Sequence, residues 1–337
     1  MARDRAKEGE KRRVVILVVP PVDELDLVGP AQVFAAANRL SGRSAYRVEI
    51  VTSGDDLRVR GEGGLLSFHA DLRLAEAGPP FDSVLLVCGL ANRRRHDPAL
   101  SEWLRAAAVH ARRLGAVCVG AFLLAEAGLL DGRKATAHWR FAEELARRHP
   151  AVRVESAPIW VQDGNLFTSA GISAGIDLAL AWVERDLGGA IAGEIARELV
   201  LFLRRPGEQN QLSLSLTSQE RAPNRIGALL VWIAENPASK LTADRLADRA
   251  GMTIRSLERH FAREVGRTPA RYVRDARIEA ARRQLQTTSL SLEQVARACG
   301  FGGADVMRRV FRSAREAAPR DIRRAALAPM GAQAGKA

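Results

Sequence analysis

The sequence predicts two domains of different classes: an α/β domain with a mainly parallel sheet and helices on both faces, followed by an all-α domain. Over the first two-thirds of the chain, apolar runs that suit buried strands alternate with helical stretches, whereas the last third reads as helix throughout. The charge is equally uneven, because residues 226–337 hold 21 Lys and Arg against 11 Asp and Glu and so carry +10 of the net charge of +12. A domain this basic favours a polyanionic partner.

The front domain is expected over residues 14–203, after a disordered basic arm at residues 1–13. The expected strands are residues 14–19, 48–52, 83–88 and 116–119, with a further strand or hairpin at 159–168. The expected helices are residues 30–40, with Pro30 in the first turn, 99–114, 121–127 and 174–187. This strand–helix alternation is typical of a parallel sheet covered on both faces.

A stretch rich in Pro, Gly, Ser, Gln and Asn interrupts this alternation at residues 204–225 and is expected to be a linker. The basic all-α domain is expected at residues 226–325 and a disordered tail at 326–337.

A helix-turn-helix pattern occurs twice in the basic domain. Gly251 separates two short amphipathic helices in residues 241–261, and Gly300 does so in residues 290–311. Thr242 is expected to cap the first unit, and Ser291 with Gln294 to form a capping box in the second. One such unit is a weak signal, but two in tandem in a basic domain favour DNA binding over a plain helical bundle.

The second helix of each unit is expected to place its exposed face in a major groove. The candidate base-reading residues are Arg255, Glu258 and Arg259 in the first unit and Ala304, Asp305, Arg308 and Arg309 in the second. Arg suits the two acceptors of a guanine edge, and Asp can accept from cytosine. The helical stretch at residues 269–286, about 27 Å long, can hold the two base-reading helices about one DNA turn (~34 Å) apart.

Residues 226–325 resemble the AraC-type DNA-binding domain. The matching stretches are LADRAGMTIRSLERHFAREVGRTPARYVRDARIEAARRQL and VARACGFGGADVMRRVF, and the matching characteristic positions are Pro269, Arg277, Ala281, Gly300, Phe301 and Phe311. The resemblance implies that both second helices read base edges. The sequence departs from the family at residues 315–319, which lack the usual Gly, and at Gly303, where a capping Ser is usual.

The front domain carries a cysteine at a strand-to-helix junction. Cys118 is followed two residues later by Gly120, which suits a nucleophile elbow, and a helix N-terminus there can favour the thiolate. His138 and Asp26 could complete a nucleophilic set. The spacing alone favours the other interpretation, in which the cysteine is structural, the histidine lies at an interface and the aspartate lies on the surface.

Residues 14–200 resemble the PfpI/ThiJ superfamily, a relative of class I glutamine amidotransferases, through LDLVGPAQVF, VCVGAFLLAEAGLLDGRKATAHW and DGNLFTSAGISAGIDLALAWVE. The resemblance places Cys118 at the elbow and His138 and Asp26 near the partner positions. Val119 stands where some hydrolytic members have His, and residues 88–90 stand where a Gly pair often makes an oxyanion site. The implied role is therefore a pocket that senses a small molecule, and the two domains together have the architecture of GlxA-type transcriptional regulators.

The leading interpretation is a sequence-specific transcriptional regulator that is not an enzyme. Its expected partners are operator DNA, a small-molecule effector of unknown identity and a second copy of the chain in a homodimer, with RNA polymerase as a further candidate. The alternatives are a cysteine-dependent amidase or hydrolase with a DNA-binding appendage, and a redox sensor that acts through Cys118.

No cofactor and no metal site is expected, because the three cysteines and the histidines lack ligand spacing. No apolar run approaches the ~20 residues of a membrane helix, and the first residues lack the apolar core of a signal peptide. A cytoplasmic, nucleoid-associated protein is therefore expected.

Overall fold

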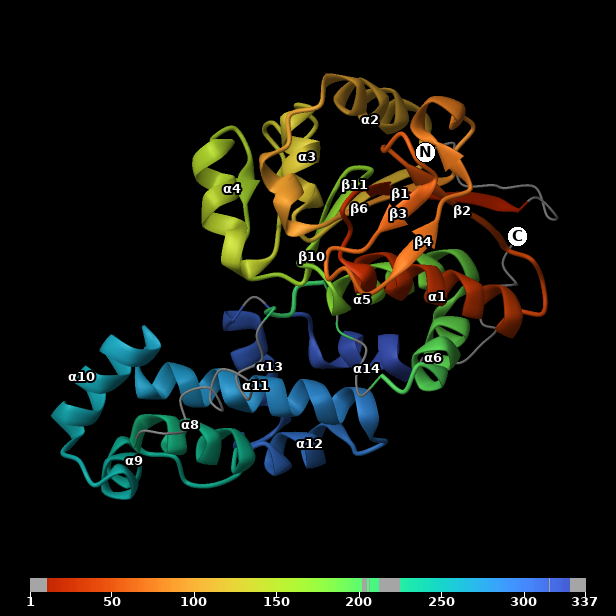
Figure 1. The fold of residues 1–337 in the computed structure, drawn as a ribbon. Coiled ribbons are helices and arrows are strands. Elements are labelled where there is room, and N and C mark those ends of the chain that lie inside the picture. Colours follow the sequence, from red (N-terminus) through yellow and green to blue (C-terminus); the bar gives the residue numbers. More distant parts are fainter. Residues whose placement is uncertain (1–10, 202–204, 206, 212–224, 315, 328–337) are drawn as a thin grey trace. The chain divides into compact units, whose positions relative to one another are not determined.

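The computed structural model describes residues 11–201, 205, 207–211, 225–314 and 316–327. The chain forms two compact units, Met1–Gln211 and Leu212–Ala337 (Figure 1). The first is α/β and the second is helical, which confirms the predicted fold class. The expected linker and tail lie largely outside the described residues, as do residues 1–10 of the expected arm. No described helix has both the length and the apolar character needed to cross a membrane.

One sheet of seven strands runs through the described part of the first unit. In spatial order its strands are β10 (Trp160–Asp163), β11 (Leu166–Ser169), β7 (Arg113–Val117), β6 (Ser83–Cys88), β1 (Arg12–Val19), β2 (Tyr46–Thr52) and β5 (Leu72–Arg73). All neighbours pair in parallel except β10 and β11, which form an antiparallel hairpin. The parallel sheet and the expected hairpin are thus confirmed.

Helices cover both faces of this sheet (Figure 1). On one face lie α1 (Glu24–Leu40), α5 (Ser173–Leu187) and α6 (Gly189–Glu198), and on the other lie α2 (Pro98–His110) and α3 (Gly120–Glu126). The smaller elements are the hairpin β3 (Arg58–Arg60) and β4 (Ser67–His69), the pair β8 (Lys134–Ala135) and β9 (Arg153–Val154), and α4 (Ala142–Arg148).

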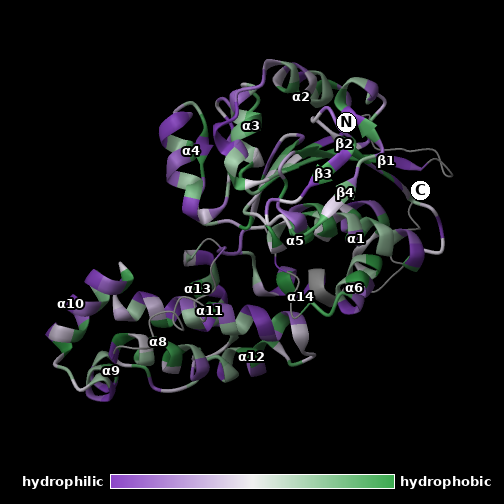
Figure 2. Cartoon of the chain, in the orientation of Figure 1, coloured by the Kyte–Doolittle hydropathy of each residue, from purple (hydrophilic) through white to green (hydrophobic). Residues whose placement is uncertain are grey.

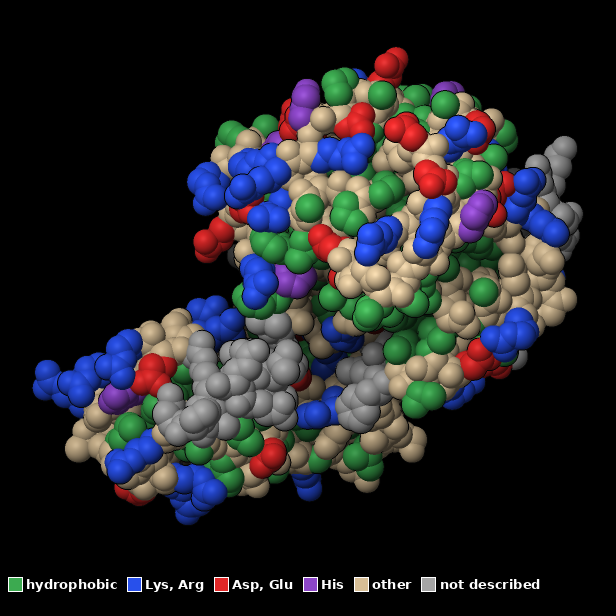
Figure 3. Space-filling view, in the orientation of Figure 1, with side chains coloured by type: hydrophobic (Ala, Val, Ile, Leu, Met, Phe, Trp, Pro, Cys, Tyr) green, Lys and Arg blue, Asp and Glu red, His purple; other side chains and the backbone are tan. Residues whose placement is uncertain are grey.

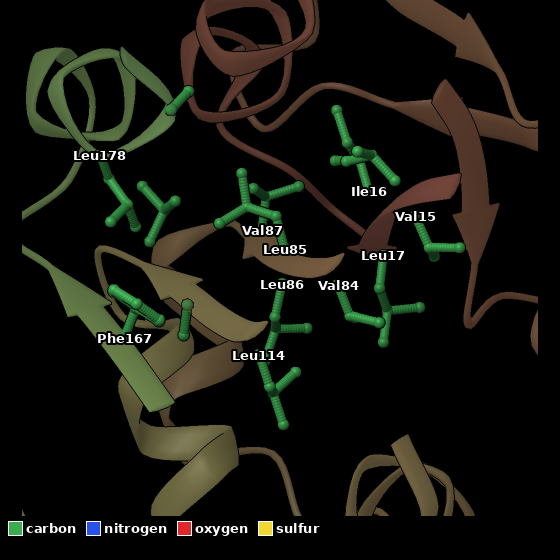
Figure 4. Close-up of a cluster of buried hydrophobic side chains, with 14 of the residues drawn as sticks. Val15, Ile16, Leu17, Val84, Leu85, Leu86, Val87, Leu114, Phe167 and Leu178 are labelled. Atoms are coloured by element: carbon green, nitrogen blue, oxygen red, sulfur yellow. The ribbon is translucent and has the colours of Figure 1, made fainter. Parts of the chain in front are cut away.

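The core follows from the apolar runs of the central strands. Every residue of β6 is buried, and so are the last six residues of β1. Leu86 and Leu114 come from neighbouring strands and lie together on one face of the sheet (Figure 4), and the strands are the hydrophobic centre of the unit (Figure 2). Each such side chain contributes about 1.5–3 kcal/mol to folding when it leaves water, so the sheet is a rigid support for what its strand ends carry.

Two elements begin earlier than expected. Helix α1 starts at Glu24 with Pro30 inside it, because the carboxylate of Asp23 accepts a hydrogen bond from the backbone N–H of Leu25 and caps the helix at that point. Strand β7 starts at Arg113, whose guanidinium makes two hydrogen bonds of 2.9 and 2.8 Å to the carboxylate of Asp186 and so can be buried in a strand.

The second unit contains α8 (Arg225–Glu235), α9 (Ala243–Ala250), α10 (Ile254–Val265), α11 (Pro269–Thr287), α12 (Leu292–Ala298), α13 (Ala304–Ser313) and α14 (Pro319–Leu327). Hydrophobic and hydrophilic residues alternate along these helices (Figure 2). Their apolar faces form two separate cores, one around Phe261 and Tyr272 and one around Met307 and Phe311. Helix α14 follows the atypical residues 315–319 and still buries Ile322 in the second core.

Candidate functional site

Two helix-turn-helix units follow one another in the second unit. Helices α9 and α10 are joined through Gly251, with φ of 61°, and α12 and α13 through Gly300, with φ of 76°. Glycine suits these left-handed turns because it has no Cβ to clash with the backbone. Both turns stand where the sequence predicted them.

The helix starts agree with the prediction in part. The capping box of Ser291 and Gln294 is present, with hydrogen bonds in both directions. Thr242 occupies the N-cap position of α9, but its side chain makes no capping hydrogen bond, so the expected cap is wrong in this detail.

The predicted reading residues lie on α10 and α13. Arg255, Glu258 and Arg259 are exposed on α10, opposite the buried side chains Leu257 and Phe261. Lys and Arg side chains gather over the α10 end of the second unit (Figure 3). The exposed, cationic face of α10 can therefore enter a major groove. Contact of these residues with DNA stays a prediction.

On α13, Asp305 and Arg309 are exposed, whereas Ala304 and Arg308 are half-buried. Nη2 of Arg308 donates a hydrogen bond to Asp305 one turn earlier. A pair with one exposed partner contributes little to stability, so either side chain can exchange its partner for a base edge at small cost.

Glu293 supplies the cap that Gly303 lacks. Its carboxylate on α12 accepts a hydrogen bond of 2.8 Å from the backbone N–H of Ala304, the first residue of α13, and this bond lowers the pKa of Glu293. A carboxylate at this end of a helix also suits the helix dipole. Helix α12 thus fixes the start of the second reading helix through a contact that the sequence analysis did not identify.

Cys118 occupies a strained position at the carboxyl end of β7. Its φ is 58°, and its backbone N–H donates to the carbonyl of Ser169 at 3.0 Å. The thiol packs so closely on Gly171 that a Cβ there would lie 2.7 Å from Sγ. Burial, and then the nearby carboxyl of Asp26, raise the pKa of Cys118 well above that of a free thiol. The elbow geometry is thus present, but the thiolate that a helix N-terminus can favour is disfavoured here by burial.

Asp26 is a buried residue of α1, so the interpretation that placed it on the surface is wrong. One carboxylate oxygen accepts a hydrogen bond of 2.6 Å from the backbone N–H of Ile172, and the other has no partner among the described residues. Burial raises the pKa of Asp26 to about 7, against the lowering effect of the Ile172 hydrogen bond. Ile172 itself has φ of 44°, so strained backbone meets a titrating carboxyl here.

His138 does not complete a nucleophilic set. Its Nδ1 accepts a hydrogen bond from the backbone N–H of Arg140, and burial lowers the pKa of His138. Within the described part of the chain, no hydrogen bond joins His138, Cys118 and Asp26 to one another. The structure therefore associates Asp26 with the cysteine and leaves the histidine apart.

Glu62, which the sequence analysis did not select, binds backbone N–H groups beside residues 88–90, where related proteins often have an oxyanion site. Its carboxylate accepts hydrogen bonds from the backbone N–H groups of Leu90 at 2.9 Å and Ala91 at 3.3 Å. The close approach requires Gly89, because a Cβ there would lie 2.8 Å from the carboxyl carbon of Glu62. Donors that could stabilise an oxyanion are thus already used by the chain itself.

The same site is connected to the end of the first unit. Helix α5 starts directly after Ile172, and its carboxylate Asp177 binds the guanidinium of Arg205 at 2.9 and 2.6 Å. Arg205 also donates to the hydroxyl of Ser173 at 2.8 Å. Nε2 of Gln211 then binds the carbonyl oxygens of Ala137 and Pro158. Arg205, in the segment that leads toward the second unit, is therefore held by α5, and the residue before α5, Ile172, binds Asp26.

Comparison with known proteins identifies both units. Residues 12–185 match the DJ-1/PfpI family model, and residues 246–325 match a helix-turn-helix domain model. The chain is 29% identical to the HTH-type transcriptional regulator CdhR of Pseudomonas aeruginosa, over 95% of each chain. It is 31% identical to the isonitrile hydratase of Pseudomonas putida, over 52% of this chain and 72% of that enzyme.

Among solved structures, an AraC family transcriptional regulator from Pseudomonas putida has the same fold with a TM-score of 0.51 and 24% identity, over 56% of this chain and 99% of that one. The protein is thus of the class that joins an α/β domain to an AraC-type helix-turn-helix DNA-binding domain. The chain belongs to the DJ-1/PfpI family.

Proposed function

We propose that the chain is a sequence-specific DNA-binding regulator of transcription whose first unit responds to a small-molecule effector. The observation that carries the proposal is the pair of helix-turn-helix units, each with arginines on the outward face of its second helix. Residues 204–225 are then the linker between sensing and DNA binding. RNA polymerase is a partner that such a regulator would meet at a promoter.

The chemistry at Cys118 favours a sensor over an enzyme. A nucleophilic thiol needs a thiolate and a positioned base, but here the thiol is buried with a raised pKa, and His138 makes no hydrogen bond to it. Glu62 also holds the backbone donors that an oxyanion would need. These features count against hydrolysis and equally against rapid oxidation of the thiol.

The effector site that we propose is centred on Asp26, Cys118 and Ile172. A carboxyl with a pKa of about 7 and strained backbone beside it can change state at small cost in free energy. A ligand that displaces the Ile172 N–H from Asp26 would shift the start of α5. Because Asp177 of α5 holds Arg205, that shift would reach the segment leading to the DNA-binding unit.

We also propose a homodimer formed by the first unit. Its α1 exposes Leu25 and Val28, and the turn after β3 exposes Leu65 and Leu66. The turn lies beside α1, because a bridge joins Val22 to Gly61. Apolar side chains gathered in this way suit burial against a second copy of the same surface.

Arg259→Ala is expected to weaken operator binding by about 1–3 kcal/mol and to leave non-specific duplex binding nearly unchanged, because a base contact is lost and phosphate contacts remain. Arg308→Ala tests α13 in the same way. The matched control is Arg263→Ala, since Arg263 lies one turn further along α10 and already pairs with Glu264. Titration of operator and random-sequence duplexes measures both affinities. An equal loss on the two duplexes would make Arg259 a phosphate contact.

Cys118→Ser is expected to retain operator binding without effector but to alter the response to effector, because the serine keeps the size of the site and changes its chemistry. Neither the natural protein nor Cys118→Ala should hydrolyse amides or esters. The measurements are operator affinity with and without candidate metabolites, and release of product from model substrates. Steady hydrolysis by the natural protein that Cys118→Ala abolishes would establish an enzyme instead.

A further inference from the structure

Arg277 lies at the boundary between the two cores of the second unit. Along α11, Ala276 is the last residue of the first core and Ile278 is the first residue of the second. The first core unites α8, α9 and α10 with the start of α11, whereas the second unites the rest of α11 with α12, α13 and α14. The alignment of the two helix-turn-helix units therefore depends on α11 and on the contacts that cross this boundary.

The side chain of Arg277 makes such a contact. Its Nε donates to the carbonyl oxygen of Pro237 at 3.0 Å and its Nη2 donates to that of Ser239 at 3.1 Å, both in the loop between α8 and α9. The guanidinium is a planar fork with fixed donor directions, so it holds the two carbonyls at a set spacing. A lysine keeps the charge but has a single compact ammonium group, and it cannot reproduce both bonds in this geometry.

The turn of the second helix-turn-helix unit packs on the same place. A Cβ on Gly300 would overlap the carbonyl oxygen of Pro237 and lie 2.8 Å from Nε of Arg277. The loop between α8 and α9, the guanidinium on α11 and the turn between α12 and α13 thus meet around the carbonyl group of Pro237. Gly300 is required both for the φ of 76° and for this close approach.

Apolar packing does not take over this role next to Arg277. An open hollow of about 540 Å³ lies there between residues 234–239 on one side and Ala280, Arg283, Gln284 and Ala298 on the other. Since side chains leave this space unfilled, the polar contact of Arg277 and the packing of Gly300 hold the two sides together at this point.

We propose that Arg277, packed on Gly300, is a positioning residue that sets the separation and rotation of α10 and α13 on one DNA duplex. The proposal rests on the proposed function, in that both helices must read the same duplex. Two linked modules gain affinity over either alone only when their geometry matches the two sites. One base pair changes that geometry by about 3.4 Å and about 35°.

The test measures how tolerant each variant is of spacing. Operators are first selected from a random duplex library with the full natural chain. Affinities are then measured by fluorescence anisotropy for the selected duplex, for duplexes with one base pair inserted or removed between the two contacted blocks, and for each block alone. The variants are Arg277→Lys and Gly300→Ala, and the control is Arg274→Lys, whose side chain bonds only to Asp275 in the structure described here.

For the natural chain and the control, changed spacing should lower affinity about tenfold or more. Arg277→Lys should lose about tenfold on the selected duplex, bind single blocks as before, and show little further loss when the spacing changes. Gly300→Ala should act in the same direction. A spacing penalty that Arg277→Lys leaves intact, or an equal loss on single blocks, would overturn the role of Arg277. A natural chain that tolerates every spacing would instead overturn reading of one duplex by both helices.

Discussion

At pH 8, the Asp26→Asn variant is expected to have a free energy of unfolding up to about 4 kcal/mol higher than the natural protein. Burial raises the pKa of Asp26 from 3.8 to about 7, so between these values the folded chain holds a proton that the unfolded chain has lost. The stability of the natural protein should therefore fall as the pH rises through this window and level off above it. Asparagine does not titrate and can still accept the N–H of Ile172.

The measurement is urea unfolding of the first unit at several pH values. The advantage of Asp26→Asn should grow by roughly 3 kcal/mol between pH 5 and pH 8. Glu143→Gln is the matched control, since Glu143 is an exposed carboxylate on α4 and should show no such growth. A difference that is the same at every pH would mean that Asp26 titrates like a solvated carboxyl.

If the result is as expected, Asp26 changes protonation close to neutral pH while it binds the start of the segment that leads into α5. Ligands that prefer one protonation state would then shift the strained backbone at Ile172. This gives the proposed sensor a source of differential free energy between its two states, which any effector response requires.

The parts of the fold that local sequence signals determine were predictable. Strand β6 has the predicted bounds because a fully apolar run of this length suits a buried parallel strand. The turns at Gly251 and Gly300 and the capping box at Ser291 were predictable because they depend on residues within a few positions of one another. The predicted start of α1 was wrong because Pro30 resembles a first-turn proline. The helix in fact begins at the cap of Asp23, and tertiary packing keeps it helical past Pro30.

The candidate site was less predictable, because its chemistry depends on contacts between distant residues. Asp26 accepts a hydrogen bond from a backbone N–H 146 positions away, and Glu62 accepts one from a backbone N–H 28 positions away. The cap of α13 by Glu293 spans 11 positions. No periodicity or short motif encodes such pairs, so Cys118 could be found from its elbow sequence while the state of its thiol could not.

Binding of the full chain to its operator is expected to weaken by about 10³-fold or more between 50 and 200 mM salt, because phosphate contacts by Lys and Arg release condensed counterions. The exposed arginines of α10 and α13 and the charge of +10 on residues 226–337 provide for several such contacts. The slope of log affinity against log salt gives their number. Arg259→Ala should leave this slope nearly unchanged if Arg259 reads a base.

The most direct test of the central claim is a hydroxyl-radical footprint of the full natural chain on its selected operator, taken across this salt series. The expected result is, for each chain bound, two protected patches about one DNA turn apart on one face of the duplex, since α10 and α13 each occupy a major groove, with protection lost steeply as salt rises. A single patch for each chain bound would contradict reading by both helix-turn-helix units. A chain that shows no salt-sensitive binding to any duplex at low ionic strength would contradict DNA recognition altogether.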